Sequence, residues 1–223
     1  MFKKTPVAAG IAAFASMIIA GGVAVADVDY TAMSAEELAE YLIFEADGFN
    51  LDQEVQEGGT AKQRMVQDEM QKACSVIGGG QPDQATLDAV RTAAVESITY
   101  PEGGIQLGDW ERGRELAWSG FGFRIGHNPD NHDARAVGGN CYNCHQMATD
   151  RTGGTVGPSL TGYGKTRGTS EAMLKYAYDM IYNPHACFPC TNMPRFGSSG
   201  FLTEEAIADI MAYMFDPESP VNE

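Results

Sequence analysis

Basic residues and cysteines are scarce in this chain of 223 residues, and each scarcity excludes a class of protein. Lys and Arg number 15 against 30 Asp and Glu, and the net charge of −15 argues against nucleic acid or an anionic membrane surface as partner. We interpret the negative charge mainly as a solvated surface. The alternative is that it steers a basic partner toward the protein. Five cysteines are too few for a disulfide-dense scaffold. No internal repeat and no convincing β pattern is present, so an all-α fold is expected.

The one long apolar run stands at the N-terminus and predicts a secretory signal peptide over residues 1–26. Lys3 and Lys4 precede about twenty apolar or small residues, which end in an Ala-x-Ala motif at Ala26. An uncleaved membrane anchor is the alternative, since a run of this length spans a bilayer. The run consists mostly of Ala and Gly, which form weak membrane spans, so we favour a cleaved signal peptide over an anchor. We therefore expect a periplasmic protein with no membrane span after cleavage, in a compartment where disulfides form.

Residues 27–94 are expected to be a helical extension without a chemical motif. Ser34 and Glu37 form a capping box at the start of the first helix. A second helix is predicted from Thr60, with apolar residues at helical spacing as far as Ile77. A third follows Asp83.

Residues 95–223 are expected to form one domain, to which residues 27–94 are an extension. Asp109 is predicted to cap a helix that runs to about Ser119, in which small residues on one face permit close approach of another helix. Ser170 begins a further helix, and Thr203 caps the last one, which ends at Asp216. Loops rich in Gly, Asn and Asp are expected at 120–140 and 151–169.

Cys141-Tyr142-Asn143-Cys144-His145 is the C-x-x-C-H pattern of covalent haem attachment. Two thiols about one turn apart add across the haem vinyl groups, and the adjacent His145 supplies the proximal nitrogen to the iron. Chance, a dithiol redox pair and half of a zinc site are the alternatives. A redox pair favours a βαβ setting, and zinc requires a second pair of ligands. The sequence therefore predicts one haem c bound through Cys141 and Cys144.

Gly157-Pro158 follows His145 by about a dozen residues and is predicted to orient it. A proline carbonyl at this place accepts the ring N–H of the ligand histidine and raises its basicity. The alternative is that Gly-Pro is only a turn.

The sixth iron ligand is predicted to be Met193, which lies in a loop between the last two helices. Only a loop there can lie across the distal face of the haem. His185 is the main rival, and Met147 is too close to His145. The other methionines considered belong to the helical stripes, at Met173, Met180, Met211 and Met214. Ligation by His and Met closes the iron, which suits electron transfer.

The three remaining cysteines are an odd number, so at least one is free or pairs outside the chain. Cys187 and Cys190 repeat the C-x-x-C spacing, but Thr191 follows them, so they are not a second haem motif. Either they form a disulfide, or Cys74 is bonded to one of them. A redox or metal role for this pair is a further alternative. His127 and His132 are expected to be exposed to solvent.

Several segments together resemble the SoxX cytochrome family of the thiosulfate-oxidising Sox system. The resemblance covers residues 95–223. The C-x-x-C-H motif alone would indicate only some c-type cytochrome, whereas the Met-Pro-Arg-Phe-Gly loop and the Ser-Pro-Val-Asn tail point to this family in particular. The segments that carry it are Gly108–Trp110, Gly139–His145, Gly157–Leu160, Asn192–Gly197, Leu202–Glu205 and Ser219–Asn222.

The resemblance implies a class I-like, all-α cytochrome c domain with Cys141 and Cys144 on the haem and with His145 and Met193 as axial ligands. In this fold the helices at 109–119 and 203–214 cross. SoxX is the mono-haem subunit of SoxAX, which joins thiosulfate to a cysteine of the carrier SoxYZ with loss of two electrons. The sulfur chemistry of this L-cysteine S-thiosulfotransferase belongs to SoxA.

The chain is therefore expected to be a non-catalytic electron-transfer subunit. It would form a heterodimer with SoxA and would pass electrons to a small soluble cytochrome c. The extension at 27–94 and the pair Cys187 and Cys190 depart from the short form of the family. Two other functions stay open: a free-standing periplasmic electron carrier, and a redox-sensing module switched by Cys187 and Cys190.

Overall fold

The computed structural model describes residues 28–55, 57–75, 80–125 and 135–223. Regular structure in those ranges is helical, apart from one isolated antiparallel bridge between Glu54 and Thr60, which confirms the all-α prediction. No helix in them has the length and apolar character needed to cross a bilayer. The predicted signal peptide, His127 and His132 lie outside the described residues.

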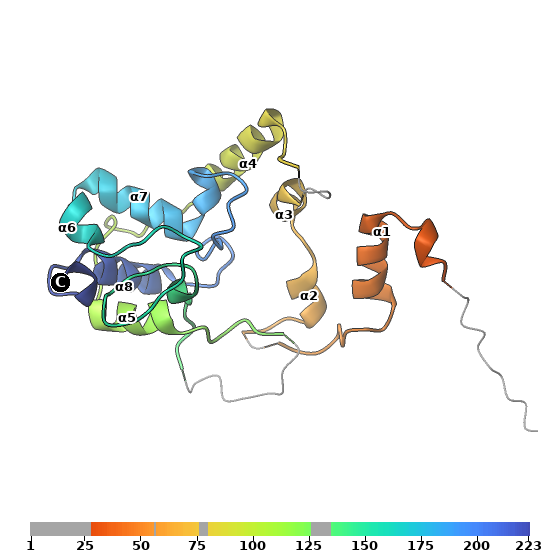
Figure 1. Ribbon diagram of the computed structural model, residues 1–223, viewed down its shortest axis with the longest axis horizontal. Helices are drawn as coiled ribbons and strands as arrows, with labels where there is room; N and C mark the ends of the chain where they lie inside the picture. Colours follow the sequence, from red (N-terminus) through yellow and green to blue (C-terminus); the bar gives the residue numbers. More distant parts are fainter. Residues whose placement is uncertain (1–27, 56, 76–79, 126–134) are drawn as a thin grey trace, which may run out of the picture.

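The first helix, α1 (Ala35–Glu40), begins at the predicted capping box and continues into a π-helical turn, η2 (Tyr41–Glu45). The Ser34 hydroxyl accepts the Glu37 backbone N–H, and the Glu37 carboxylate accepts the Ser34 N–H. Neither α1 nor η2 contains a buried residue. Figure 1 shows α1 well apart from the helices of the C-terminal half.

The single helix predicted from Thr60 to Ile77 is wrong, because the chain forms two short helices there. α2 (Ala61–Met65) starts at Thr60 as expected, but Val66 takes an extended conformation with ψ 123°. Asp68 then accepts the Gln71 N–H at 2.8 Å and starts α3 (Glu69–Cys74). The capping box at Asp68 thus interrupts an apolar stripe that favours one continuous helix.

Helix α4 (Gln84–Glu96) begins after Asp83 as predicted and lies beside the C-terminal half. Its buried residues are Val90 and Ala94. Directly after it, the Ser97 hydroxyl accepts a hydrogen bond from the Asn183 side chain at 2.9 Å. The predicted domain boundary between residues 94 and 95 falls inside this helix.

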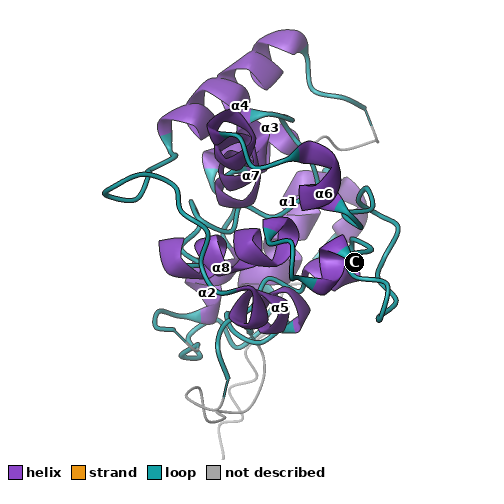
Figure 2. Cartoon of the chain, turned by 90° about the vertical axis from the view of Figure 1, so that its left-hand side faces the viewer, coloured by secondary structure: helices purple, strands orange, loops and turns teal. Residues whose placement is uncertain are grey.

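The centre of the C-terminal half is the crossing of α5 (Trp110–Trp118) and α8 (Glu204–Phe215), which lie side by side in both views (Figures 1 and 2). This crossing confirms the sequence-based expectation. A Cβ on Gly113 would collide with the backbone carbonyl of Asp209 and would lie 3.0 Å from the Ile210 nitrogen. The absence of a side chain at Gly113 therefore sets the close approach of the two helices.

Asp209 joins the two helices through polar contacts, although it is 2% exposed. Its carboxylate accepts the Asp109 N–H at 2.8 Å and the Arg112 guanidinium at 2.7 Å. A buried carboxylate needs such partners, because an unpaired charge in the core is costly. The same ion pair raises the pKa of Arg112, mainly through its hydrogen bond to Asp209.

Helices α6 (Tyr163–Arg167) and α7 (Glu171–Tyr182) complete this half of the molecule. α7 begins after Ser170 as predicted, but α6 lies where a loop was expected. The Asn222 side chain accepts the Lys165 N–H at 3.0 Å, and Gly164 packs on Phe215. The C-terminal tail thus stabilises α6 through contacts that a local pattern does not contain.

Candidate functional site

The C-x-x-C-H segment folds into one tight turn, the 3₁₀ helix η4 (Cys141–Asn143) and the two residues that follow it. The Cys141 carbonyl accepts the Cys144 N–H at 3.1 Å and the His145 N–H at 2.8 Å. Both cysteines are free thiols, and desolvation raises the pKa of Cys141 to about 12. The turn therefore presents two thiol sulfurs and one imidazole from five consecutive residues.

Backbone groups hold the His145 ring in one orientation. Its Nδ1 lies 2.7 Å from the carbonyl oxygen of Pro158, as the sequence predicted. A carbonyl only accepts, so Nδ1 carries the proton and the lone pair of Nε2 is free for a metal. A Cβ on Gly157 would lie 2.6 Å from Nδ1 and 2.8 Å from Nε2, so glycine is the residue that fits against the ring.

The loop that carries Pro158 is hydrogen-bonded along the attachment turn. Gly154 N–H donates to the Tyr142 carbonyl, and Gly157 N–H donates to the Cys144 carbonyl, both at 2.8 Å. The Gln146 side chain accepts the Gly153 N–H at 2.8 Å. Since the turn and the loop share these bonds, the position of Pro158 relative to His145 is fixed by the backbone.

Met193 is half-buried and packs against the same core cluster as Cys141. Phe196, three residues later and 8% exposed, connects this loop to the attachment turn. A Cβ on Gly139 would lie 3.3 Å from the Phe196 ring and 3.5 Å from Cys141 Sγ, so these two side chains flank one spot. The structure therefore brings the Met193 loop next to the predicted haem-attachment turn.

Four of the other candidate ligands are engaged elsewhere. Met147 and Met211 are fully buried in the core, and Met214 is 6% exposed. His185 accepts the Cys190 N–H on Nδ1 at 2.8 Å, which puts the proton of the neutral ring on Nε2. Neither nitrogen of His185 then offers a free lone pair, and burial lowers its pKa, which favours the neutral form. These observations favour Met193 over His185.

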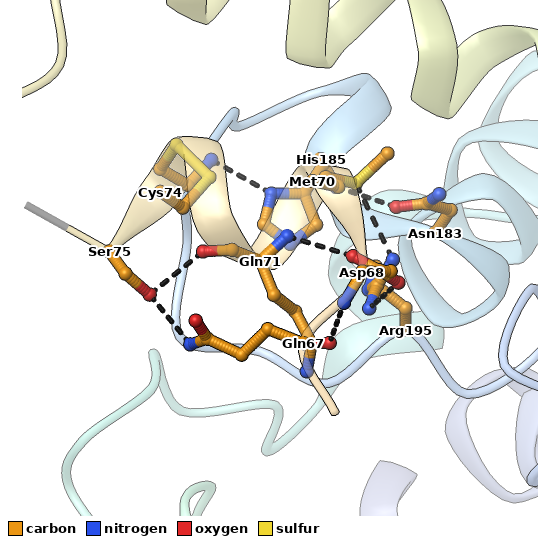
Figure 3. The surroundings of a disulfide bond; sticks show 10 residues. Gln67, Asp68, Met70, Gln71, Cys74, Ser75, Asn183, His185 and Arg195 are labelled. Atoms are coloured by element: carbon orange, nitrogen blue, oxygen red, sulfur yellow. Dashed lines mark hydrogen bonds and ion pairs between the residues drawn. A yellow bond between two sulfur atoms is a disulfide. The ribbon is translucent and has the colours of Figure 1, made fainter. Parts of the chain in front are cut away.

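Cys74 and Cys190 form a disulfide with a Cα–Cα distance of 5.1 Å (Figure 3). Cys187 is a free thiol. The sequence left open either a Cys187–Cys190 disulfide or a bond from Cys74 to one of these two residues. The second alternative is confirmed. The bond joins the end of α3 to the loop of Met193.

The cytochrome c family matches residues 134–216, a range that encloses both the attachment turn and the Met193 loop. This part of the chain is a cytochrome c domain. An uncharacterised lipoprotein of Aquifex aeolicus (strain VF5) is 40% identical over 159 residues, which are 70% of this chain and 73% of that protein. The chain belongs to the same family as that lipoprotein. The crystal structure of SoxXA from P. pantotrophus contains a chain that is 21% identical with a TM-score of 0.36, over 56% of this chain and 95% of that one.

The cytochrome c domain binds one covalently attached haem c, and the geometry around its attachment turn fits that group. Two free thiols stand one turn apart, Nε2 of His145 has a free lone pair, and a glycine leaves room for the imidazole beside them. The bound haem supplies an iron that accepts and releases one electron at a time.

Sequence reasoning missed the contacts that join the attachment turn to the helices of the cytochrome c domain. The Tyr142 hydroxyl lies 2.6 Å from that of Tyr213 on α8 and accepts the Ala148 N–H. Trp118 of α5 packs edge-on against Tyr142, with the ring centroids 5.5 Å apart. The Arg151 guanidinium lies over the Trp118 ring, 3.6 Å from its centroid. Tyr142 occupies a variable position of the C-x-x-C-H pattern, so the motif gives no signal for this role.

Proposed function

We propose that this chain is an exported one-electron carrier in which Cys141 and Cys144 hold the haem and His145 and Met193 ligate its iron. The observation that best supports this is the His145 ring, fixed by the Pro158 carbonyl and by Gly157 so that Nε2 is free. Ligation by His and Met raises the reduction potential and leaves no open position for oxygen or substrate. The chain's own residues would then hold, orient and shield the haem.

More specifically, we propose that the chain is the SoxX-type subunit of a periplasmic SoxAX complex. The motifs spread over residues 95–223 support this, from the Gly108–Trp110 segment to the Ser219–Asn222 tail. SoxA would be its heterodimer partner, SoxYZ a transient partner and a small soluble cytochrome c its electron acceptor. Residues 1–26 would be a signal peptide and residues 27–94 an extension to the cytochrome c domain. The Aquifex relative is named a lipoprotein, and lipoproteins are exported, which supports export of this chain.

Electron counting defines the task of a mono-haem subunit in this reaction. Joining thiosulfate to a thiol through a new S–S bond releases two electrons and the thiol proton. A single haem holds one of these electrons, so the chain would be reduced and reoxidised twice for each bond formed. The bond-forming groups belong to the partner, and we assign no acid, base or nucleophile to this chain.

Mixing the haem-loaded chain with SoxA tests this proposal. We expect a 1:1 complex in native gels, and haem reduction that requires SoxA, SoxYZ and thiosulfate together. Omitting each component in turn is the control. A stable monomer that takes electrons without SoxA contradicts the subunit role and supports the free-standing carrier.

A further inference from the structure

Two anchors tie the loop of Met193 to helix α3, a segment outside the matched cytochrome c domain. The first is the disulfide from Cys74, the last residue of α3, to Cys190, three residues before Met193. These cysteines are 116 residues apart in the sequence. Figure 3 shows α3 lying directly over this loop. Met193 is thus held on its N-terminal side by a covalent bond.

The second anchor is an ion pair on the C-terminal side of Met193. Arg195 Nη2 lies 2.7 Å from Asp68 Oδ2, and Arg195 Nη1 lies 3.7 Å from the sulfur of Met70. The Arg195 side chain is 17% exposed and that of Asp68 is 52% exposed, so the pair is shielded from solvent on its Arg195 side. Asp68 is also the N-cap of α3, so this helix start fixes the orientation of its carboxylate.

The backbone between the anchors is constrained as well. Cys190 has φ +60°, a left-handed conformation that a residue with a side chain seldom adopts unless its surroundings impose it. His185 fixes this position by accepting the Cys190 N–H at 2.8 Å. Between α3 and the loop lies a cleft of about 460 Å³, to which Gln71, Thr191 and Met193 contribute. The anchors therefore hold the two ends of the Met193 segment, and the cleft leaves space beside it.

We propose that Asp68 and Cys74, at the two ends of α3, act as a positioning strap that keeps Met193 on the haem iron. This inference rests on the proposed function, in which Met193 is the sixth ligand. A ligand carried by a loop leaves the iron whenever the loop opens, and each opening exposes the iron to outside ligands. An anchor on either side of Met193 restricts the loop in advance, so less conformational freedom is lost when the sulfur binds. The residues that position Met193 through these anchors are Asp68, Cys74, Cys190 and Arg195.

Imidazole binding to the oxidised, haem-loaded full chain tests the strap, because imidazole competes with the methionine sulfur. The disulfide variant is Cys74→Ser combined with Cys187→Ser, since a free Cys187 would otherwise pair with the released Cys190. Its control is Cys187→Ser alone. We expect the double variant to bind imidazole at least about tenfold more tightly than the control, a shift within the range that loop preorganisation supplies. The far-UV circular dichroism of the two should agree.

Asp68→Asn tests the second anchor with the disulfide intact. Asparagine is as good an N-cap as aspartate, so α3 is kept and only the charge is lost. We expect imidazole to bind roughly two- to fivefold more tightly, because a partly exposed ion pair contributes only a small stabilising free energy. Glu69→Gln is the matched control, because Glu69 is 92% exposed and pairs with Lys72 inside α3. It should leave imidazole binding unchanged.

The outcomes separate this proposal from the function on which it rests. If the wild type binds imidazole as tightly as Met193→Ala, Met193 is not a ligand and the proposed function fails. If Met193→Ala binds imidazole far more tightly than the wild type, Met193 is a ligand. Should the disulfide variant and Asp68→Asn then match their controls within twofold, the strap is overturned and the ligand assignment stands.

Discussion

The Gly157→Ala variant is expected to dislodge the His145 imidazole. An added methyl group would collide with Cε1 of the ring and would lie 2.6 Å from Nδ1, so the ring has to turn away from the Pro158 carbonyl. Losing a hydrogen bond that orients a metal ligand costs roughly 10- to 100-fold in metal affinity. Since the haem is covalently attached, we expect it to remain while the imidazole detaches. The oxidised protein should show a high-spin visible spectrum, with a lower midpoint in guanidinium chloride.

Gly48→Ala is the control for this variant. The nearest atom to its added Cβ is the Leu42 carbonyl oxygen at 3.5 Å, an ordinary contact. It should keep the low-spin spectrum and the guanidinium midpoint of the wild type. A low-spin spectrum and an unchanged midpoint in Gly157→Ala would contradict the close packing of Gly157 on the ring.

Gly113→Ala is expected to destabilise the whole cytochrome c domain. Helix propensity alone predicts a gain of about 1 kcal/mol, because alanine favours a helix interior over glycine. The added Cβ would, however, meet the carbonyl group of Asp209 and the Ile210 nitrogen, which belong to the backbone of α8 and have no rotamer to change. Overpacking costs typically 1–3 kcal/mol and occasionally more. We expect the steric cost to exceed the propensity gain, with a net loss of about 2 kcal/mol in the free energy of unfolding.

Denaturant unfolding of the haem-loaded protein measures this loss. Glu115→Ala on the exposed face of α5 is the matched control, because it changes helix propensity without approaching α8. Its free energy of unfolding should stay within about 0.5 kcal/mol of the wild type. A Gly113→Ala variant that is more stable than the wild type would show that α5 and α8 are free to separate.

Local signals in the sequence predict where most helices begin. Asp83, Asp109, Ser170 and Thr203 each accept a backbone N–H of the helix that follows, because an N-cap acts within three residues of its own position. The two errors, over 60–77 and at α6, have different causes. Between α2 and α3, the local capping box at Asp68 outweighs an apolar stripe that favours one helix. Helix α6 depends on the side chain of Asn222, at the far end of the chain.

The candidate haem site shows the same difference between local features, which the sequence predicts, and distant contacts, which it does not. The attachment turn and Pro158 are predictable because haem chemistry fixes the spacing of the first and sequence proximity to His145 indicates the second. The Tyr142–Tyr213 pair and the Asp68–Arg195 ion pair join residues that are 71 and 127 positions apart. No pattern along the chain relates such partners. The sequence therefore supplies the proposed haem ligands and the nearby Pro158, but not the distant contacts that hold them in place.

We propose that His145 and Met193 together close the haem iron for electron transfer. The most direct test is the absorption spectrum of the oxidised, haem-loaded chain in the near infrared, where a methionine sulfur bound to ferric haem gives a charge-transfer band. We expect this band in the wild type and in the control Met180→Ala, and its loss in Met193→Ala. The reduction potential of Met193→Ala should fall on the order of 0.1 V or more, within the roughly 0.8 V over which axial ligands tune haem. A wild type without the band, or a Met193→Ala variant that keeps it, would contradict the assignment.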